Sequence, residues 1–281
     1  MNQMQALSNE QIARVAPSVF ATEPWQGVSD RYAFIPTIQV VDRLRDEGFF
    51  PVRAQQSRSR IPGKGDFTKH MLRFRRESDM AIPKVVDGNA HHFFKVPPVV
   101  PELVLVNAHD RSSAYALDAG LFRQLCSNGL MVSAGDLAGI HVRHSGNVVD
   151  DVLEGSFKII DEMPQVMEHV EHMRAIQLAL PQQIAFATAA AEVRWGHDDK
   201  GAALAPVQPE QLLRPRRRED DAADLWATFN RVQENMIKGG LRGRGTTGKR
   251  TTTRAVGSVT EDVRLNKALW MLAEKMAQLA A

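Results

Sequence analysis

The side chains best suited to chemistry are gathered near the C-terminus, in residues 235–260 (NMIKGGLRGRGTTGKRTTTRAVGSVT). This segment holds no acidic residue, and glycines and threonines separate its basic residues. Glycine lets backbone amides approach an anion closely, and Lys, Arg and Thr side chains bind phosphate oxygens. Because the charge is spread along the segment, a long phosphate backbone suits it better than one small phosphate. The sequence therefore predicts nucleic-acid binding; the alternative is a flexible surface loop with incidental charge.

A second basic segment, residues 53–76, holds eight basic residues and a single acid. In its part HMLRFR, Leu72 and Phe74 alternate with Arg73 and Arg75, which is the period of a strand. A basic sheet face beside a basic loop would make a groove that follows a phosphate chain. We therefore expect this segment to contribute to the same nucleic-acid interface.

Both segments supply the predicted contacts to phosphate. These are Arg58, Arg60, Lys64, Lys69, Arg73, Arg75, Lys238, Arg242, Arg244, Lys249, Arg250 and Arg254. Two aromatic residues of the second segment, Phe67 and Phe74, are either stacking surfaces for bases or ordinary core residues.

Histidines raise the alternative of a metal-dependent nucleic-acid enzyme. His70, His109, Asp110 and His144 lie in or beside predicted strands, and zinc accepts such ligands. No His-Glu-x-x-His pair appears, and Ser112 beside His109 and Asp110 does not form a triad, whose groups converge from separate elements. The string GRGTTGKRT lacks the glycine spacing of a phosphate-binding loop. We therefore predict no catalytic residue, no metal and no cofactor.

The elements that must position these residues follow from hydrophobic periodicity and turn signals. We expect helices over 10–16, 36–47, 149–173, 182–195, 224–238 and 261–279, and strands over 49–55, 67–75, 102–107, 113–117 and 140–144. This order predicts an α+β fold, with an antiparallel β-sheet packed by long helices.

Three further segments are interpreted from local signals, two of them with alternatives. A short helix over 121–126 is favoured over a hairpin at Asn128-Gly129. Pro164 predicts a kink or a break in the long helix, and the segment 76–101 is predicted to be a surface loop.

The predicted organisation has four parts. Residues 1–35 form a lead-in, 36–195 an α+β core and 196–221 a linker. Residues 222–281 form C-terminal helices that include the basic Gly/Thr loop 238–257.

The composition limits the classes of protein to which this chain can belong. The chain has 281 residues, 43% hydrophobic and 24% charged, with a net charge of +2, which is ordinary for a globular protein. Its single cysteine excludes an intrachain disulfide and suits a reducing cytoplasm. No apolar run is long enough for a membrane span, and the start MNQMQALSNEQIARV lacks a signal core. We expect a cytoplasmic protein with no membrane partner.

Several phrases of the sequence resemble a phage- and plasmid-borne family that is known as a domain of unknown function. They are YAFIPTIQVVDRL, FTKHMLRFR, ELVLVNAHDRSSAYALDAGLFRQLCSNGL, HVRHSG and VRLNKALWMLAEK. The resemblance runs from about Val19 to the C-terminus, and it is most specific from Asn107 through Gly129. It implies a mobile-element protein of a bacterial cytoplasm and transfers no catalytic residue.

At the level of fold, the predicted order of elements is similar to the core of single-strand annealing proteins, both the phage beta-type and the eukaryotic Rad-type. That similarity implies a protein that forms rings or filaments and holds single-stranded DNA in a basic groove without ATP. Together with the two basic segments it predicts a single-stranded DNA-binding protein that promotes annealing and recombination. The alternatives are the metal-dependent enzyme and an interaction protein that blocks a host defence factor.

Overall fold

The computed structural model describes residues 5–26, 34–80, 99–123, 129–132, 139–142, 147–217 and 220–280. The chain divides into two compact units, which we treat separately. The first comprises residues 1–163 with 258–260, and the second residues 164–257 with 261–281. The boundary at Pro164 falls inside the predicted 36–195 core, and the four predicted parts of the chain stay a prediction.

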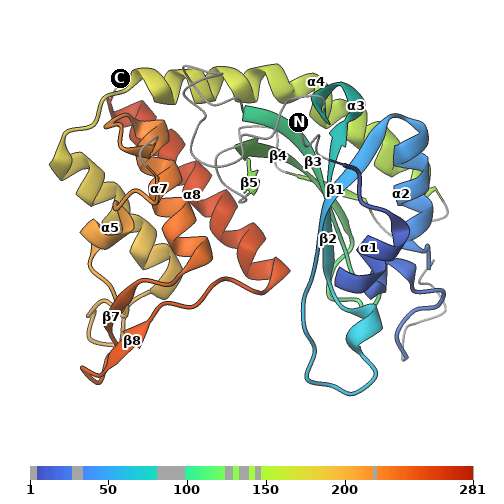
Figure 1. Ribbon diagram of the computed structural model, residues 1–281, viewed down its shortest axis with the longest axis horizontal. Helices are drawn as coiled ribbons and strands as arrows, with labels where there is room; N and C mark the ends of the chain where they lie inside the picture. Colours follow the sequence, from blue (N-terminus) through green and yellow to red (C-terminus); the bar gives the residue numbers. More distant parts are fainter. Residues whose placement is uncertain are drawn as a thin grey trace. The chain divides into compact units, whose positions relative to one another are not determined.

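The first unit is built on an antiparallel sheet (Figure 1). Its strands are β1 (Phe49–Gln56), β2 (His70–Arg76), β3 (Val99–Asn107), β4 (Tyr115–Arg123), β5 (Gly129–Met131) and β6 (Ile140–Val142). They are ordered β1-β2-β3-β4-β5, and β6 also pairs with β4. Pro51 lies in the edge strand β1, where a residue without an N–H is tolerated. The predicted α+β class with an antiparallel sheet is confirmed.

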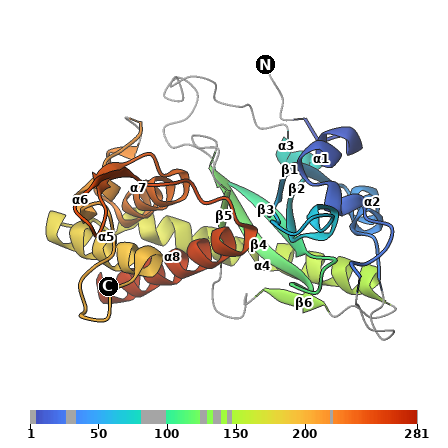
Figure 2. The same cartoon turned by 90° about the horizontal axis from the view of Figure 1, so that it is seen from below.

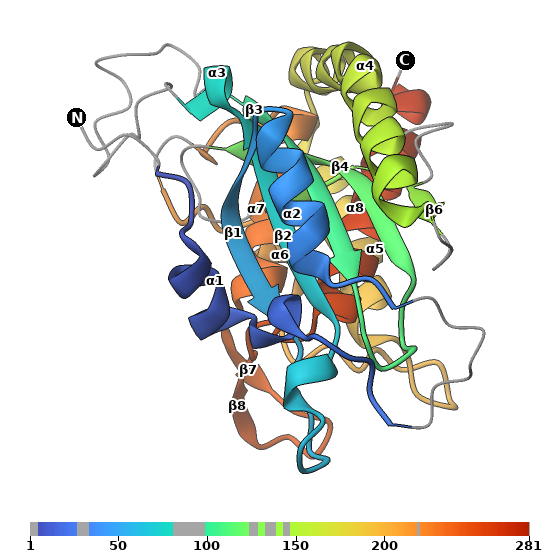
Figure 3. The ribbon, with the colours of Figure 1, turned by 90° about the vertical axis from the view of Figure 1, so that its right-hand side faces the viewer.

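Helices cover one face of this sheet. Leu72, Leu105 and Leu117 are paired across β2, β3 and β4 and are fully buried. Figure 3 shows α2 (Thr37–Asp46) and α4 (Val148–Ala175) lying over the same face. On α4, Gly155 leaves the room that the close approach needs, since a Cβ there would lie 3.0 Å from Leu117 Cδ1.

Short elements complete the first unit. They are α1 (Asn9–Val15), the 3₁₀ turns η1 (Pro17–Phe20) and η2 (Gly65–Phe67), and α3 (Glu77–Met80). Helix α1 begins after Ser8 with a capping box to Gln11. Helix α2 buries Thr37, Val40, Val41 and Leu44.

The second unit is helical and carries one β-hairpin. It contains the end of α4, then α5 (Leu180–Trp195), α6 (Pro209–Leu212), α7 (Leu225–Lys238), β7 (Arg242–Arg244), β8 (Arg250–Thr252) and α8 (Val259–Ala280). Helices α7 and α8 lie side by side (Figures 1 and 2), with Trp226 and Phe229 packed against Trp270. Asp224 caps α7 by accepting the Ala227 N–H at 2.8 Å.

Some local predictions were wrong. The helix over 121–126 is not formed, because Leu121 and Phe122 continue β4 and pair with Leu130 and Gly129. Sheet pairing thus overrides local helical spacing there, and residues 124–128 lie outside the described residues. Of the kink or break predicted at Pro164, the break is absent, since α4 runs from Val148 to Ala175; the kink stays a prediction.

Two predicted irregular segments contain regular structure. The linker holds α6, and the predicted loop over 76–101 holds α3 and the start of β3. Residues 81–98 lie outside the described residues. None of the helices in the described ranges is long and apolar enough to cross a bilayer.

Candidate nucleic-acid interface

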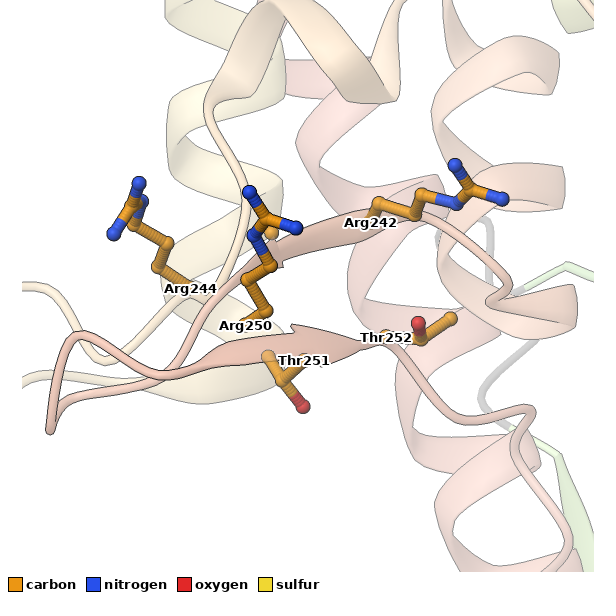
Figure 4. A pocket seen from close by; sticks show the side chains of 6 residues that line it. Arg242, Arg244, Arg250, Thr251 and Thr252 are labelled. Atoms are coloured by element: carbon orange, nitrogen blue, oxygen red, sulfur yellow. The ribbon is translucent and has the colours of Figure 1, made fainter.

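The basic Gly/Thr segment forms the β7–β8 hairpin rather than a loop. Arg242 is paired with Thr252, Gly243 with Thr251, and Arg244 with Arg250. Residues directly opposite each other in an antiparallel pair share a face, as do alternate residues of one strand. Three arginines therefore point to one side of the hairpin, and Figure 4 shows Thr251 pointing to the other. This side, with Arg242, Arg244, Arg250 and Thr252, is called the arginine face below.

The hairpin is anchored to the rest of the second unit along β7. The Arg244 N–H donates to the Pro206 carbonyl at 2.8 Å, and the Gln211 Nε2 donates to the Arg242 carbonyl at 2.9 Å. Gly243 permits this contact, because a Cβ there would lie 1.8 Å from the Pro206 oxygen. Strand β7 is thus held by β8 on one edge and by Pro206 and Gln211 on the other, whereas the sequence predicted a loop here.

Among the described residues, no acid pairs with the arginine face. Arg242, Arg244, Lys249 and Arg250 are exposed, and no ion pair in the described part of the chain involves them. The nearest acids in sequence have other partners. Glu234 pairs with Arg217 and Lys238, and Glu261 pairs with Arg264. A pocket of about 460 Å³ opens at the hairpin, lined by Arg242, Gly243, Arg244, Arg250, Thr251 and Thr252.

The remaining basic residues of the segment behave differently. Lys238 at the end of α7 forms an ion pair with Glu234 at 2.6 Å. Arg254 is exposed, and its carbonyl accepts a hydrogen bond from Arg194. Upstream, Arg217 also pairs with Glu234, so the basic run before α7 is partly neutralised within the unit.

The hairpin anchor provides a test that removes no charge. We expect Gly243→Ala to weaken nucleic-acid binding, because the added Cβ collides with the Pro206 carbonyl and must displace β7. Gly245→Ala is the matched control: it lies in the same hairpin, and its Cβ would meet no atom closer than 3.9 Å. Titration of a labelled single strand with both variants measures the difference. Equal affinities of the two variants would show that the anchor does not position the arginines.

In the first unit, the turn between β1 and β2 carries exposed charge. Arg58 and Arg60 are exposed there, and Lys69 is partly exposed. Lys64 is held by Asp110, with 3.0 Å between Nζ and Oδ2. This turn is a second candidate contact.

Arg73 and Arg75 do not lie on an exposed basic face. They do point to the opposite side of β2 from Leu72, as the alternation predicts, but both are buried, at 2% and 3% exposure. Each bonds the buried Glu102 carboxylate, Arg73 Nη1 at 2.9 Å and Arg75 Nε at 2.7 Å. Arg75 also lies over the Phe122 ring at 4.0 Å. The prediction that they contact phosphate is therefore corrected, because both guanidinium groups bind Glu102 inside the fold.

The two aromatic residues of this segment take different positions. Phe74 is fully buried in the core. Phe67 is half-buried against Trp25, with 5.3 Å between ring centroids. Neither ring is presented as an open stacking surface.

The histidines form a buried polar cluster around Thr37, the first residue of α2. Its hydroxyl lies 2.9 Å from His70 Nε2, 3.1 Å from His109 Nε2 and 3.0 Å from Asn107 Nδ2, which donates to it. A hydroxyl gives one hydrogen bond and accepts two, so these three nearest neighbours can satisfy it; a fourth, Tyr115 Oη, lies 3.4 Å away. The cluster joins α2 to the ends of β2 and β3.

The hydrogen bonds around His70 determine which of its ring nitrogens carries the proton. The Ser18 hydroxyl donates to Gln56 at 2.7 Å, so it accepts from His70 Nδ1, which lies 2.8 Å away. Nε2 of His70 then accepts the Thr37 proton. Both ring nitrogens are occupied by protein, which leaves no lone pair for a metal.

The residues predicted for the metal-dependent alternative are not grouped as a set of ligands in the described part of the chain. Asp110 is engaged by Lys64, and His144 lies outside the described residues. Within the ranges that the structure covers, no three His, Cys, Asp or Glu side chains are grouped to hold a metal ion.

The cluster makes stability sensitive to mild acid. Burial lowers the pKa of His70 from 6.5 to about 4. The neutral ring is therefore favoured in the fold, and its contribution is complete above pH ~6.5 and is lost as the pH falls towards 4. The full difference amounts to about 3 kcal/mol. We expect unfolding free energy to fall across this range, measured by urea titration. In His70→Gln this fall is expected to be smaller; an unchanged slope would contradict the assignment.

Sequence reasoning missed the residues that organise these sites, namely Glu102, Thr37 and Asn107. Glu102 is the only acid in the apolar strand VVPELVLVN, and such an isolated acid is a signal of a buried ion pair. Thr37 and Asn107 gave no signal of their own, because their partners are distant in sequence.

An antiparallel sheet covered by helices, followed by a helical unit with a basic hairpin, defines an α+β protein with a candidate phosphate-binding surface. Residues 24–270 match the family described as domain of unknown function (DUF932), and the chain belongs to this family. It is similar to two proteins of Escherichia coli (strain K12), the UPF0380 protein YafZ and the UPF0380 protein YfjQ. Each is 42% identical over 270 residues, which cover 96% of this chain and 91% of the relative. No solved structure matches the chain significantly.

The predicted membership of a family of unknown function is thereby confirmed. The similarity to annealing proteins stays a prediction.

Proposed function

We propose that the protein binds single-stranded DNA through the arginine face and promotes annealing of complementary strands without ATP. The proposal rests on a difference in ion pairing between two groups of basic residues. Arg73, Arg75, Arg217 and Lys238 are neutralised by acids of the fold. In the described residues, the arginines of the anchored hairpin have no acidic partner. A polyanion from outside the chain is the natural partner for such a surface.

The mechanism that we propose is non-covalent. Arginine and threonine side chains neutralise and bond the phosphates, while the bases stay exposed and pair with a complementary strand. Arg58 and Arg60 at the β1–β2 turn supply a second contact. Neutralising the charge of one strand lowers its repulsion of the next, and this step consumes no nucleotide.

We further propose that the protein acts in the cytoplasm for a phage or plasmid, as a ring or filament of identical subunits. Repetition multiplies weak phosphate contacts along a polymer. Light scattering with a single strand bound is expected to give a mass of several times 31.3 kDa. A mass of one subunit throughout would contradict the ring and the filament.

A strand-annealing assay tests the function itself. Two complementary labelled oligonucleotides, mixed with the protein in the absence of ATP and of divalent metal, are expected to anneal faster than without protein. Gly245→Ala, which leaves the hairpin unstrained, serves as the positive control. If single strands bind but anneal no faster than alone, the protein is a binding protein and the annealing step is wrong.

A further inference from the structure

We infer that the arginine face binds two successive phosphates of a nucleic-acid backbone, with the strand laid along β7. This inference rests on the proposed function and specifies its ligand as a phosphodiester chain rather than a single phosphate. It also assigns the contacts: Arg244 with Arg250 at one phosphate, and Arg242 with Thr252 at the next.

The hydrogen bonds of the hairpin bring the first two arginines close. The Gly245 N–H points to β8 and donates to the Lys249 carbonyl at 2.9 Å, whereas the Arg244 N–H points away from β8 to Pro206. Arg244 and Arg250 are therefore a non-hydrogen-bonded pair, the kind whose Cα atoms are about 4.5 Å apart and whose side chains lie closest.

Such a pair is unfavourable in the free protein. Like charges directly opposite each other destabilise a hairpin, and Arg242 adds a third positive charge diagonal to Arg250. No acid in the described residues relieves this repulsion, and the anchor at Pro206 prevents β7 from moving away. A phosphate placed between the two guanidinium groups is attracted by both and offsets their repulsion. The unbound hairpin is therefore already arranged to bind phosphate.

The spacing along the strand indicates more than one phosphate. Arg242 and Arg244 are two residues apart on β7, which separates them by about 7 Å. One phosphate held between Arg244 and Arg250 leaves Arg242 and the Thr252 hydroxyl for a neighbouring group. Because these contacts are to phosphate, the site does not distinguish base sequence.

Exchange of two neighbouring residues tests the assignment at constant composition. Arg250→Thr with Thr251→Arg keeps the net charge and moves one arginine to the opposite side of β8, at two exposed positions. We measure binding of a fluorescent oligo-dT strand by anisotropy. The exchange variant is expected to bind about threefold more weakly than wild type, with the same affinity as Arg250→Thr alone. Its salt slope is expected to be shallower by about 0.7.

A second variant gives a readout from stability. Arg250→Glu places an acid opposite Arg244, so we expect the melting temperature to stay level or rise while binding falls. A lower melting temperature together with unchanged binding would overturn the arrangement of charges.

A competition experiment separates the sources of phosphate. Unlabelled oligo-dT is expected to displace the labelled strand, and tripolyphosphate at equal phosphate concentration is not. Displacement by tripolyphosphate to the same extent would overturn the assignment of a backbone. If wild type binds the strand and the exchange variant binds equally well, this inference fails and the proposed function stands. If wild type binds no strand, both fail.

Discussion

Replacing Arg242, Arg244, Lys249 and Arg250 together by alanine is expected to lower affinity for single-stranded DNA by about a hundredfold at moderate salt. Four exposed contacts of about 0.7 kcal/mol each amount to about 3 kcal/mol. The slope of log affinity against log salt is expected to become shallower by about 0.7 for each phosphate contact that is lost.

The same variant is expected to keep its stability. All four side chains are exposed, without an ion pair in the described residues, and surface substitutions of this kind shift stability by about 0.5 kcal/mol or less each. Thermal unfolding and binding are therefore measured on the same preparation. A variant that melts normally and binds with the affinity and salt slope of wild type would remove the hairpin as the DNA contact.

Glu102→Ala is expected to destabilise the first unit by about 3–5 kcal/mol, because it leaves Arg73 and Arg75 buried without their acid. That is a large part of the stability of an ordinary domain. Urea unfolding measures the loss.

The control for this substitution is Glu261→Ala. Glu261 also pairs with an arginine, Arg264, but at an exposed position, where such a pair is worth about 1 kcal/mol or less. If Glu102→Ala costs no more than Glu261→Ala and raises DNA affinity instead, then Arg73 and Arg75 contact nucleic acid and our correction of the sequence-based prediction is wrong.

The elements that were predicted correctly depend on local signals. Helix α7 begins after its Asp224 cap and ends at Gly239, and the buried stripe of α2 has the expected period. The alternation in β2 correctly predicted that Arg73 and Leu72 point to opposite faces of the sheet. These features follow from spacing within one element, which a single sequence contains in full.

The remaining features depend on partners that are distant in sequence. Alternation cannot tell a solvated face from a buried one, and the burial of Arg73 requires Glu102 from a different strand. Likewise, Gly243 and Pro206 approach each other across 37 positions, and only this contact turns the basic segment into an anchored hairpin. The absence of acids from that segment was visible in the sequence, whereas its common arginine face was not.

The most direct test of the central claim is the salt dependence of single-strand binding by the wild-type chain. A labelled oligo-dT strand is titrated with the protein at several salt concentrations, and the dissociation constant is measured at each. In the inferred arrangement the arginine face contacts two phosphates, and Lys249 lies beside it as a further exposed cation. We predict a slope of log affinity against log salt near −2, at about −0.7 for each of three phosphate contacts. Affinity that stays flat from low to moderate salt, or no saturable binding at all, would contradict the account.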